Sequence, residues 1–273
     1  MAWKQNIIED FKQLVSFDSI SFHERKTADW LLARLKSMGF SVEEDQAGAY
    51  YGGDTGNIFA VLDGELEGDP VIFCAHMDVV EPGSGKKSIV EEDGTIHSAG
   101  DTVLGADDIS GILEILYGVQ LVIDSGKPHK KIEILFTIGE ELYVKGSDVF
   151  DYSKVTAKQA YVLDLSEETT FNIGTIQGGT ATNIMPDCCV LTAYETPLES
   201  KSVTDFQKAC EILGFSGELT GTFGGSDNNS FAKNGIEGLV LSNGMYNAHS
   251  TREYTTVDDL YKGAELIGQL ILL

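Results

Sequence analysis

Apolar residues recur every three or four positions in several stretches of the chain, and this spacing predicts amphipathic helices. Residues 108–124 are the clearest case, because Ile109, Ile112, Leu116 and Val119 would share one helical face. A glycine, Gly39, follows the second such stretch, where a helix commonly ends. We predict helices over residues 4–16, 23–38, 108–124, 203–213 and 257–272.

Short apolar runs alternate with these helices and predict buried strands. The runs are Ile58–Leu62, Val71–Ala75, Ile132–Thr137, Tyr161–Leu163 and Leu239–Leu241. Strands that alternate with helices of this length predict an α/β fold, with a mostly parallel central sheet and helices on both faces. Residues 171–197 break the alternation, because two β-rich pieces joined by a Gly-rich turn predict a small β-hairpin there.

The length and charge of the chain limit the number of domains and the kinds of partner that it can have. The 273 residues suffice for one large domain, or for one domain with a small appendage. A net charge of −24 argues against nucleic acid and against an anionic membrane surface as partners. The N-terminus lacks the pattern of a signal peptide, and no apolar run approaches the length of a membrane span. We therefore expect a cytoplasmic protein.

Residues that can bind metals or transfer protons lie where the predicted strands end and the predicted helices begin. An Asp at a helix start or a Glu after a strand is by itself usually a cap or a solvated side chain. Here they recur at places that should meet at one edge, since the carboxyl ends of parallel strands lie together and active sites form there. These residues are His76, Asp78, Asp107, Asp108, Glu140, Glu141, Asp164 and His249.

Two histidines and several carboxylates form a ligand set that suits Zn²⁺, with Co²⁺ or Mn²⁺ as alternatives. Three ligating carboxylates with two histidines would suit two divalent cations that share one carboxylate. Such a pair of cations can activate a water molecule and polarise a carbonyl group. The adjacent Glu140 and Glu141 can supply one ligand and one general base.

The ordered motifs resemble those of the aminoacylase/peptidase T group of di-zinc metallopeptidases, and most closely its peptidase T-like branch. The resemblance runs over nearly the whole chain. Three segments carry it most clearly: Ala75-His-Met-Asp-Val-Val-Glu-Pro-Gly83, Leu104-Gly-Ala-Asp-Asp108 and Asn247-Ala-His-Ser-Thr-Arg-Glu-Tyr254. It implies a cytoplasmic metallopeptidase with the catalytic-domain fold of phosphorylase/hydrolase-like zinc peptidases, whose members often dimerise through a lid domain.

The resemblance also implies a role for each motif residue. His76 and Asp164 would bind one zinc, Glu141 and His249 the other, and Asp107 would bridge them. Glu140 would be the general base for the bridging water, and Asp78 would orient His76. The peptide bond between Asp107 and Asp108 would be cis. A substrate-binding loop would comprise Gly224, Gly225, Ser226 and Asp227.

The chain departs from the family in its length. Family members carry a complete lid inserted after the aspartate that corresponds to Asp164, whereas only residues 171–197 would remain of it here. We thus expect a catalytic di-metal domain formed by residues 1–170 and 198–273, with 171–197 as a truncated lid. A neighbouring identical subunit is one way to complete so open a site.

Three functions are compatible with the motifs and the short lid. The first is an aminopeptidase-like enzyme that cleaves short peptides, and we favour it. The second is an amidohydrolase that removes the acyl group from N-acyl amino acids with the same metal chemistry. The third is a metal-binding assembly protein with little catalysis.

Overall fold

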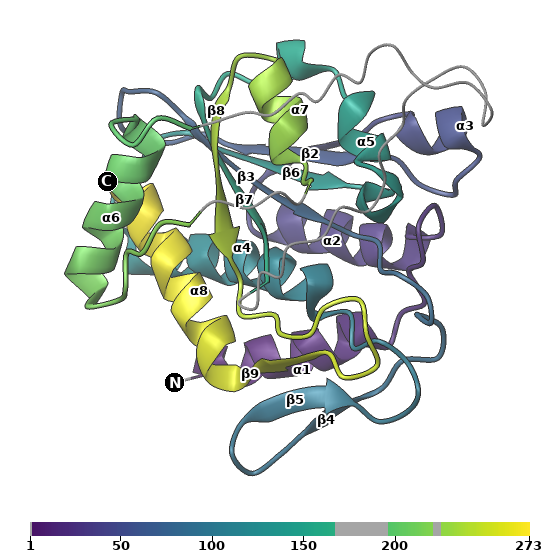
Figure 1. The fold of residues 1–273 in the computed structure, drawn as a ribbon. Coiled ribbons are helices and arrows are strands. Elements are labelled where there is room, and N and C mark those ends of the chain that lie inside the picture. The colour runs from purple at the N-terminus through teal and green to yellow at the C-terminus, as the bar shows by residue number, and fades with distance from the viewer. Residues whose placement is uncertain (1, 167–195, 221–224) are drawn as a thin grey trace, which may run out of the picture.

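The computed structural model describes residues 2–166, 196–220 and 225–273. It confirms the predicted α/β class, because helices cover both faces of a central sheet (Figure 1). Within the described residues the sheet has six strands in the order β1-β2-β6-β3-β7-β8. They are Ser41–Glu44 (β1), Ile58–Leu62 (β2), Val71–His76 (β3), Ile132–Thr137 (β6), Gln159–Leu165 (β7) and Glu237–Ser242 (β8).

The strands that carry the candidate ligands are parallel to one another. β3 pairs in parallel with both β6 and β7, and β7 pairs in parallel with β8. β2 differs from a purely parallel arrangement, because it pairs antiparallel with β1 and β6. Periodicity cannot reveal strand direction, since a buried strand has the same apolar run in either direction. The mostly parallel sheet therefore has one reversed strand among those described.

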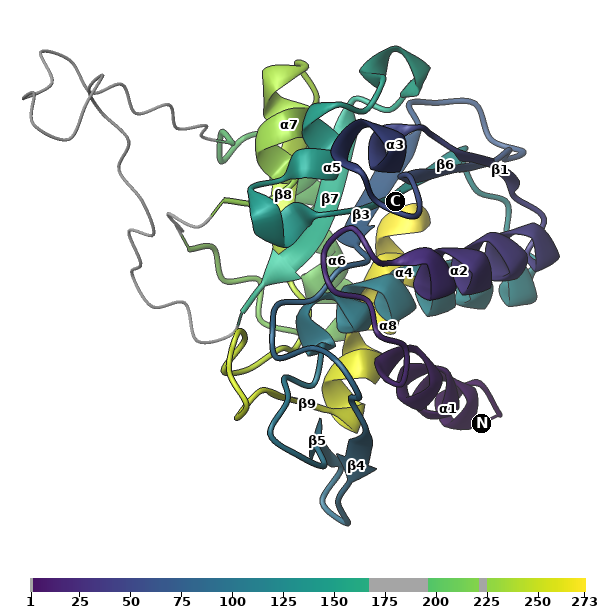
Figure 2. The same cartoon turned by 90° about the vertical axis from the view of Figure 1, so that its right-hand side faces the viewer.

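Five longer helices match the five that were predicted, within a few residues at each end. They are Ala2–Val15 (α1), Arg25–Ser37 (α2), Ala106–Ser125 (α4), Lys201–Leu213 (α6) and Val257–Ile271 (α8). Figure 2 shows α1, α2, α4 and α8 together on one side of the sheet. Shorter helices, which periodicity did not reveal, complete the described set: Ala47–Tyr51 (α3), Lys145–Asp148 (α5) and Asn228–Lys233 (α7).

The core has two parts because the sheet is buried on both faces. Along β3, Phe73 and Ala75 belong to the larger cluster beneath α1, α2, α4 and α8. Ile72 and Cys74 point the other way into a smaller cluster that includes Phe231 of α7. This alternation is the two-residue period of a strand, and it fixes β3 between two apolar layers. His76 is the next residue of β3, so its position is fixed by a strand that is buried from Ile72 onward.

A second, smaller sheet was not predicted. It joins Ser88–Val90 (β4), Thr95–Ser98 (β5) and Tyr254–Thr256 (β9) as antiparallel neighbours. Two 3₁₀ turns, Glu140–Leu142 (η1) and Tyr152–Lys154 (η2), also lie between the main elements. β9 matters for function because it starts just after the His249 motif, and so anchors that loop at one end.

The predicted hairpin at 171–197 lies outside the described residues, apart from its last two positions. The division into a catalytic domain and a truncated lid therefore stays a prediction. Within the described ranges, no helix has both the length and the apolar character needed to cross a membrane.

Candidate metal centre

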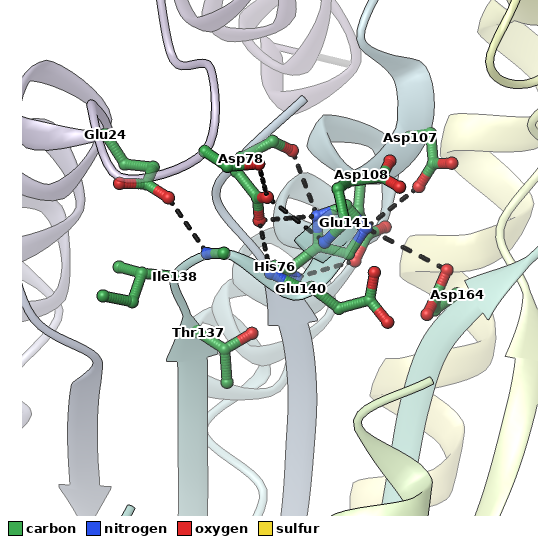
Figure 3. Close-up of polar contacts among 12 residues, drawn as sticks. Glu24, His76, Asp78, Asp107, Asp108, Thr137, Ile138, Glu140, Glu141 and Asp164 are labelled. Carbon is green, nitrogen blue, oxygen red and sulfur yellow. Dashed lines mark hydrogen bonds and ion pairs between the residues drawn. The ribbon is translucent and has the colours of Figure 1, made fainter. Parts of the chain in front are cut away.

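Figure 3 shows predicted site residues from distant parts of the chain gathered at the carboxyl edge of the main sheet, among them His76, Asp107 and Asp164. His76 is the last residue of β3, Thr137 is the last residue of β6, and Asp164 lies one residue before the end of β7. Because these three strands are adjacent and parallel, their ends bring residues distant in sequence into one place. This is the edge at which open α/β sheets bind ligands.

The ring of His76 is held so that one nitrogen faces the carboxylates. Its side chain is only 1% exposed. Nδ1 lies 3.0 Å from the backbone carbonyl oxygen of Asp78, to which it can donate a proton. Nε2 lies 3.0 Å from Oδ1 of Asp107 and 4.0 Å from Oδ1 of Asp164. A neutral ring in this tautomer would direct a lone pair from Nε2 toward two carboxylates, as a cation ligand does.

Asp107 lies between the two histidines of the predicted centre. Its Oδ1 is the atom near His76, and its Oδ2 lies 3.0 Å from Nε2 of His249. The start of α4 is irregular here: Gly105 has φ of 81°, and neither Asp107 nor Asp108 has helical backbone angles. The Asp107–Asp108 peptide bond is cis, which confirms the expectation drawn from the resemblance. The irregular turn directs the Asp107 carboxylate over the sheet edge.

The adjacent glutamates occupy a short turn that a neighbouring carboxylate holds in place. Oδ1 of Asp78 accepts a hydrogen bond from the backbone N–H of Glu140 at 3.0 Å, and Oδ2 accepts one from Glu141 at 3.2 Å. The hydroxyl of Ser21 donates to the same Oδ2 at 2.6 Å. The carboxylate of Asp78 thus orients the glutamate turn. Nδ1 of His76 lies 3.0 Å from the Asp78 carbonyl oxygen and 3.4 Å from Oδ1 of the same residue, so Asp78 also orients His76.

The electrostatics favour a cation at this site. Burial opposes ionisation of Asp107, but hydrogen bonds from His249 and His76 hold its pKa below the usual range. Burial, reinforced by neighbouring carboxylates, raises the pKa of Glu140 and of Asp164. Hydrogen bonds with Asp107 and Glu141 raise the pKa of His249 to about 10. Crowded buried carboxylates that attract protons this strongly also attract divalent cations.

The geometry of the donor atoms fits metal ions. His76, Glu140 and Asp164 each offer an atom within 4.8 Å of the others, as do His76, Asp107 and Glu141. His249 joins the second group, because its Nε2 lies 2.9 Å from Oε1 of Glu141. The structure thus brings all five predicted ligands together. Nitrogen and oxygen donors of these types suit Zn²⁺, Co²⁺ or Mn²⁺.

The loop predicted to bind substrate is only partly described. Gly224 lies outside the described residues, and Gly225 is exposed. Ser226 and Asp227 are buried, and the Asp227 carboxylate accepts a hydrogen bond from the Thr137 hydroxyl. The side chain of Asp227 therefore contacts the end of β6 beneath the site. A substrate-binding role for this loop stays a prediction.

Three buried carboxylates around the centre were given no role from the sequence. Asp108 accepts hydrogen bonds from the backbone N–H of His76 at 3.0 Å and from the Asn243 side chain at 2.6 Å. Glu24 accepts one from the Gly139 N–H at 3.0 Å, and burial raises its pKa to about 8. Glu253 accepts three from the turn before Asp107 and from Asp107 itself. Asp108 and Glu253 lie within the motifs that contain Asp107 and His249, and this proximity is the one signal in the sequence that could have indicated a role for them.

Comparison with known proteins gives a family, relatives and a shared fold. The model of peptidase family M20/M25/M40 matches residues 72–273. The protein YqjE of Bacillus subtilis is 26% identical over 367 aligned positions, which cover 99% of each chain. Since this chain has 273 residues, that relative contains residues with no counterpart here.

Two further relatives are named as peptidases. Peptidase T of Shewanella pealeana is 27% identical over 244 positions, which cover 73% of this chain and 58% of that enzyme. The crystal structure of aminopeptidase PepT from Bacillus cereus superposes with a TM-score of 0.87 at 24% identity, over 98% of each chain. At that identity the superposition shows a common fold.

Proposed function

The chain belongs to peptidase family M20/M25/M40, and from this premise we propose that it is an aminopeptidase-like hydrolase that cleaves short peptides with two divalent cations. The observation that carries the proposal is the position of Asp107. Its two carboxylate oxygens each lie 3.0 Å from the Nε2 atom of a different histidine, His76 or His249. A carboxylate shared between two ligand groups would allow two cations to lie close together and act on one substrate.

The residues divide into two groups around Asp107. His76 and Asp164 would hold one cation, Glu141 and His249 would hold the other, and Asp107 would contact both. Zn²⁺ suits this donor set best, and Co²⁺ or Mn²⁺ are the alternatives. When bound, two such cations lower the pKa of a water molecule and polarise the carbonyl group of the scissile amide.

Glu140 would act as the general base. Burial raises the pKa of its carboxyl group well above the ordinary value, and this favours a group that must hold a proton and then release it near neutral pH. The Asp78 carboxylate accepts a hydrogen bond from the backbone N–H of Glu140, and this bond holds the turn beside the site. Glu140 would take a proton from water and deliver it to the departing amine.

Short peptides with a free amino end are the proposed substrates. The likeness to peptidase T over 73% of this chain supports this choice. We further propose that 171–197 is a shortened lid, since the YqjE alignment contains more positions than this chain has residues. Location in the cytoplasm and assembly of identical subunits stay predictions from the sequence.

A matched set of substrates tests the function. The chelator-treated protein would receive Zn²⁺, Co²⁺ or Mn²⁺ and then a tripeptide, the same tripeptide acetylated at its amino end, and an N-acyl amino acid. We expect cleavage of the free tripeptide alone, and chromatography of the products would detect it. Preference for the N-acyl amino acid would make the protein a deacylase. Metal binding without turnover of any substrate would favour an assembly protein.

A further inference from the structure

One ligand of the candidate centre lies on an exposed loop. The side chain of His249 is 55% exposed, whereas those of the other four ligands are largely buried. Within this loop, residues 245–254, Asn247 has φ of 50° and His249 has φ of 61°. Non-glycine residues persist in this left-handed region only where the surroundings hold them. The loop therefore needs anchors.

Glu253 is a buried anchor within the same loop. The residue is 2% exposed, and its Oε2 accepts hydrogen bonds from the N–H groups of Leu104 at 2.7 Å and Gly105 at 2.8 Å. Its Oε1 accepts a third from the N–H of Asp107 at 2.9 Å. These groups lie at the start of α4, where backbone donors lack partners within the helix. A carboxylate is favoured there because the helix dipole places positive charge at that end.

The loop is also closed upon itself next to Glu253. Tyr246 and Tyr254 exchange two backbone hydrogen bonds, of 2.9 and 3.1 Å. Their rings stack with centroids 4.6 Å apart. His249 thus lies at the outer end of a closed loop whose base is bonded to the turn that carries Asp107. The two ligands meet at 3.0 Å, and Glu253 is the side chain that connects their backbones.

We propose that Glu253 is a positioning residue that sets the distance between Asp107 and His249, and so determines how tightly the second cation binds. This inference rests on the proposed two-cation function. The role requires a carboxylate, because both oxygens of Glu253 accept hydrogen bonds. Glutamine would offer only one acceptor oxygen, and its NH₂ group would face at least one backbone N–H that is also a donor. A glutamine therefore keeps the size of the side chain and disrupts the bonding.

The test compares Glu253→Gln with a matched control, Glu133→Gln. Glu133 is also fully buried and accepts backbone hydrogen bonds from Thr156 and Ala157, each at 3.0 Å, but it lies at the opposite end of β6. Chelator-treated proteins would be titrated with Co²⁺ while absorbance and heat are recorded. We expect the second cation to bind about 10- to 100-fold more weakly to Glu253→Gln, and both to bind normally to Glu133→Gln.

The site affected is identified with His249→Ala, which should lose the same cation outright. The inference would be overturned if Glu253→Gln bound both cations as the wild type does, or if it bound both equally weakly. In either case the proposed function would stand. A wild-type protein that binds no cation would overturn both.

If Glu253→Gln does not fold, hydrogen exchange of the wild-type protein would test whether Glu253 holds the turn before Asp107. We expect the amides of Leu104, Gly105 and Asp107 to be protected without metal. Exchange at the rate of an open loop would show that the anchor is not formed.

Discussion

The two halves of the candidate centre are built in different ways. His76 and Asp164 lie on adjacent parallel strands, and the His76 side chain is 1% exposed. His249 and Glu141 lie on a loop and on a short 3₁₀ turn, and the His249 side chain is 55% exposed. Sheet hydrogen bonds and two apolar layers fix the first half. The second half depends on individual carboxylates, Asp78 and Glu253, that bind backbone N–H groups.

This contrast shows how strands and loops fix the positions of ligand residues in different ways. A regular strand fixes the backbone position of a ligand, because each residue position follows from the register of its neighbours. A loop lacks that register, so other partners must satisfy its backbone N–H groups and those of the turns beside it. The proposed five-ligand site thus depends on residues beside its ligands, and its less regular half should respond more to changes in its surroundings.

The largest expected effect comes from the turn that the two halves share. Glu140→Gln should lower kcat for peptide hydrolysis about 10²- to 10⁴-fold, because an amide cannot accept the proton. Both cations should remain, which metal analysis of the purified variant would establish. Since Glu140 lies close to His76 and Asp164, loss of one cation would instead identify it as a ligand.

The second prediction separates the halves directly. His76→Ala and His249→Ala should each weaken one cation site by more than about 100-fold, since removal of partners of metal ligands alone costs up to that much. Their effects on folding should differ. Each change leaves buried carboxylates without a partner, but the His76 side chain is 1% exposed and the His249 side chain is 55% exposed. His76→Ala should therefore lower the free energy of unfolding by about 3 kcal/mol, and His249→Ala should lower it by about 1 kcal/mol. Urea denaturation of the metal-free proteins would measure both, and equal values would remove the contrast.

The third prediction concerns removal of the cations. Each should stabilise the folded protein by about 2.7 kcal/mol when present at 100 times its dissociation constant, and calorimetry with and without chelator would show the shift in melting temperature. Hydrogen exchange should rise more within residues 245–254 than in β3 when the cations are removed. A uniform rise across both regions would contradict the idea of unequal halves.

The fourth prediction concerns pH and Glu24, whose carboxyl group accepts a hydrogen bond from the N–H of Gly139 beside the glutamate turn. Burial raises the pKa of this carboxyl group from 4.5 to about 8. The folded state therefore holds its proton more tightly than the unfolded state, and stability falls as pH rises from about 4.5 to about 8. Glu24→Gln should flatten this fall in metal-free protein, as followed by urea denaturation at several pH values. A variant with the same pH profile as the wild type would refute the assignment.

Much of the fold follows from the sequence because burial leaves a pattern. The runs Ile58–Leu62 and Ile132–Thr137 coincide with β2 and β6, since strands buried on both faces carry nearly continuous apolar runs. β1, β4, β5 and β9 went unpredicted because they are short and mostly only half-buried. The reversed direction of β2 also leaves no trace in its composition.

The candidate site divides in the same way. His76 and Asp164 end apolar runs, and a parallel sheet brings such ends together, so their proximity could be predicted. The contacts of Glu253 and Glu24 could not, because a carboxylate that binds backbone N–H groups looks like any surface acid in sequence. Nor could the bonds of the Asp78 carboxylate to the backbone N–H groups of Glu140 and Glu141.

Stepwise metal titration of the wild-type protein, read together with peptide hydrolysis, tests the central claim most directly. We predict that chelator-treated protein binds two equivalents of Zn²⁺ or Co²⁺ per chain. The first should bind more tightly, at the strand-built half, and full hydrolysis of a free-amine tripeptide should return only with the second. Binding of one equivalent or none, or full activity in the presence of excess chelator, would contradict it.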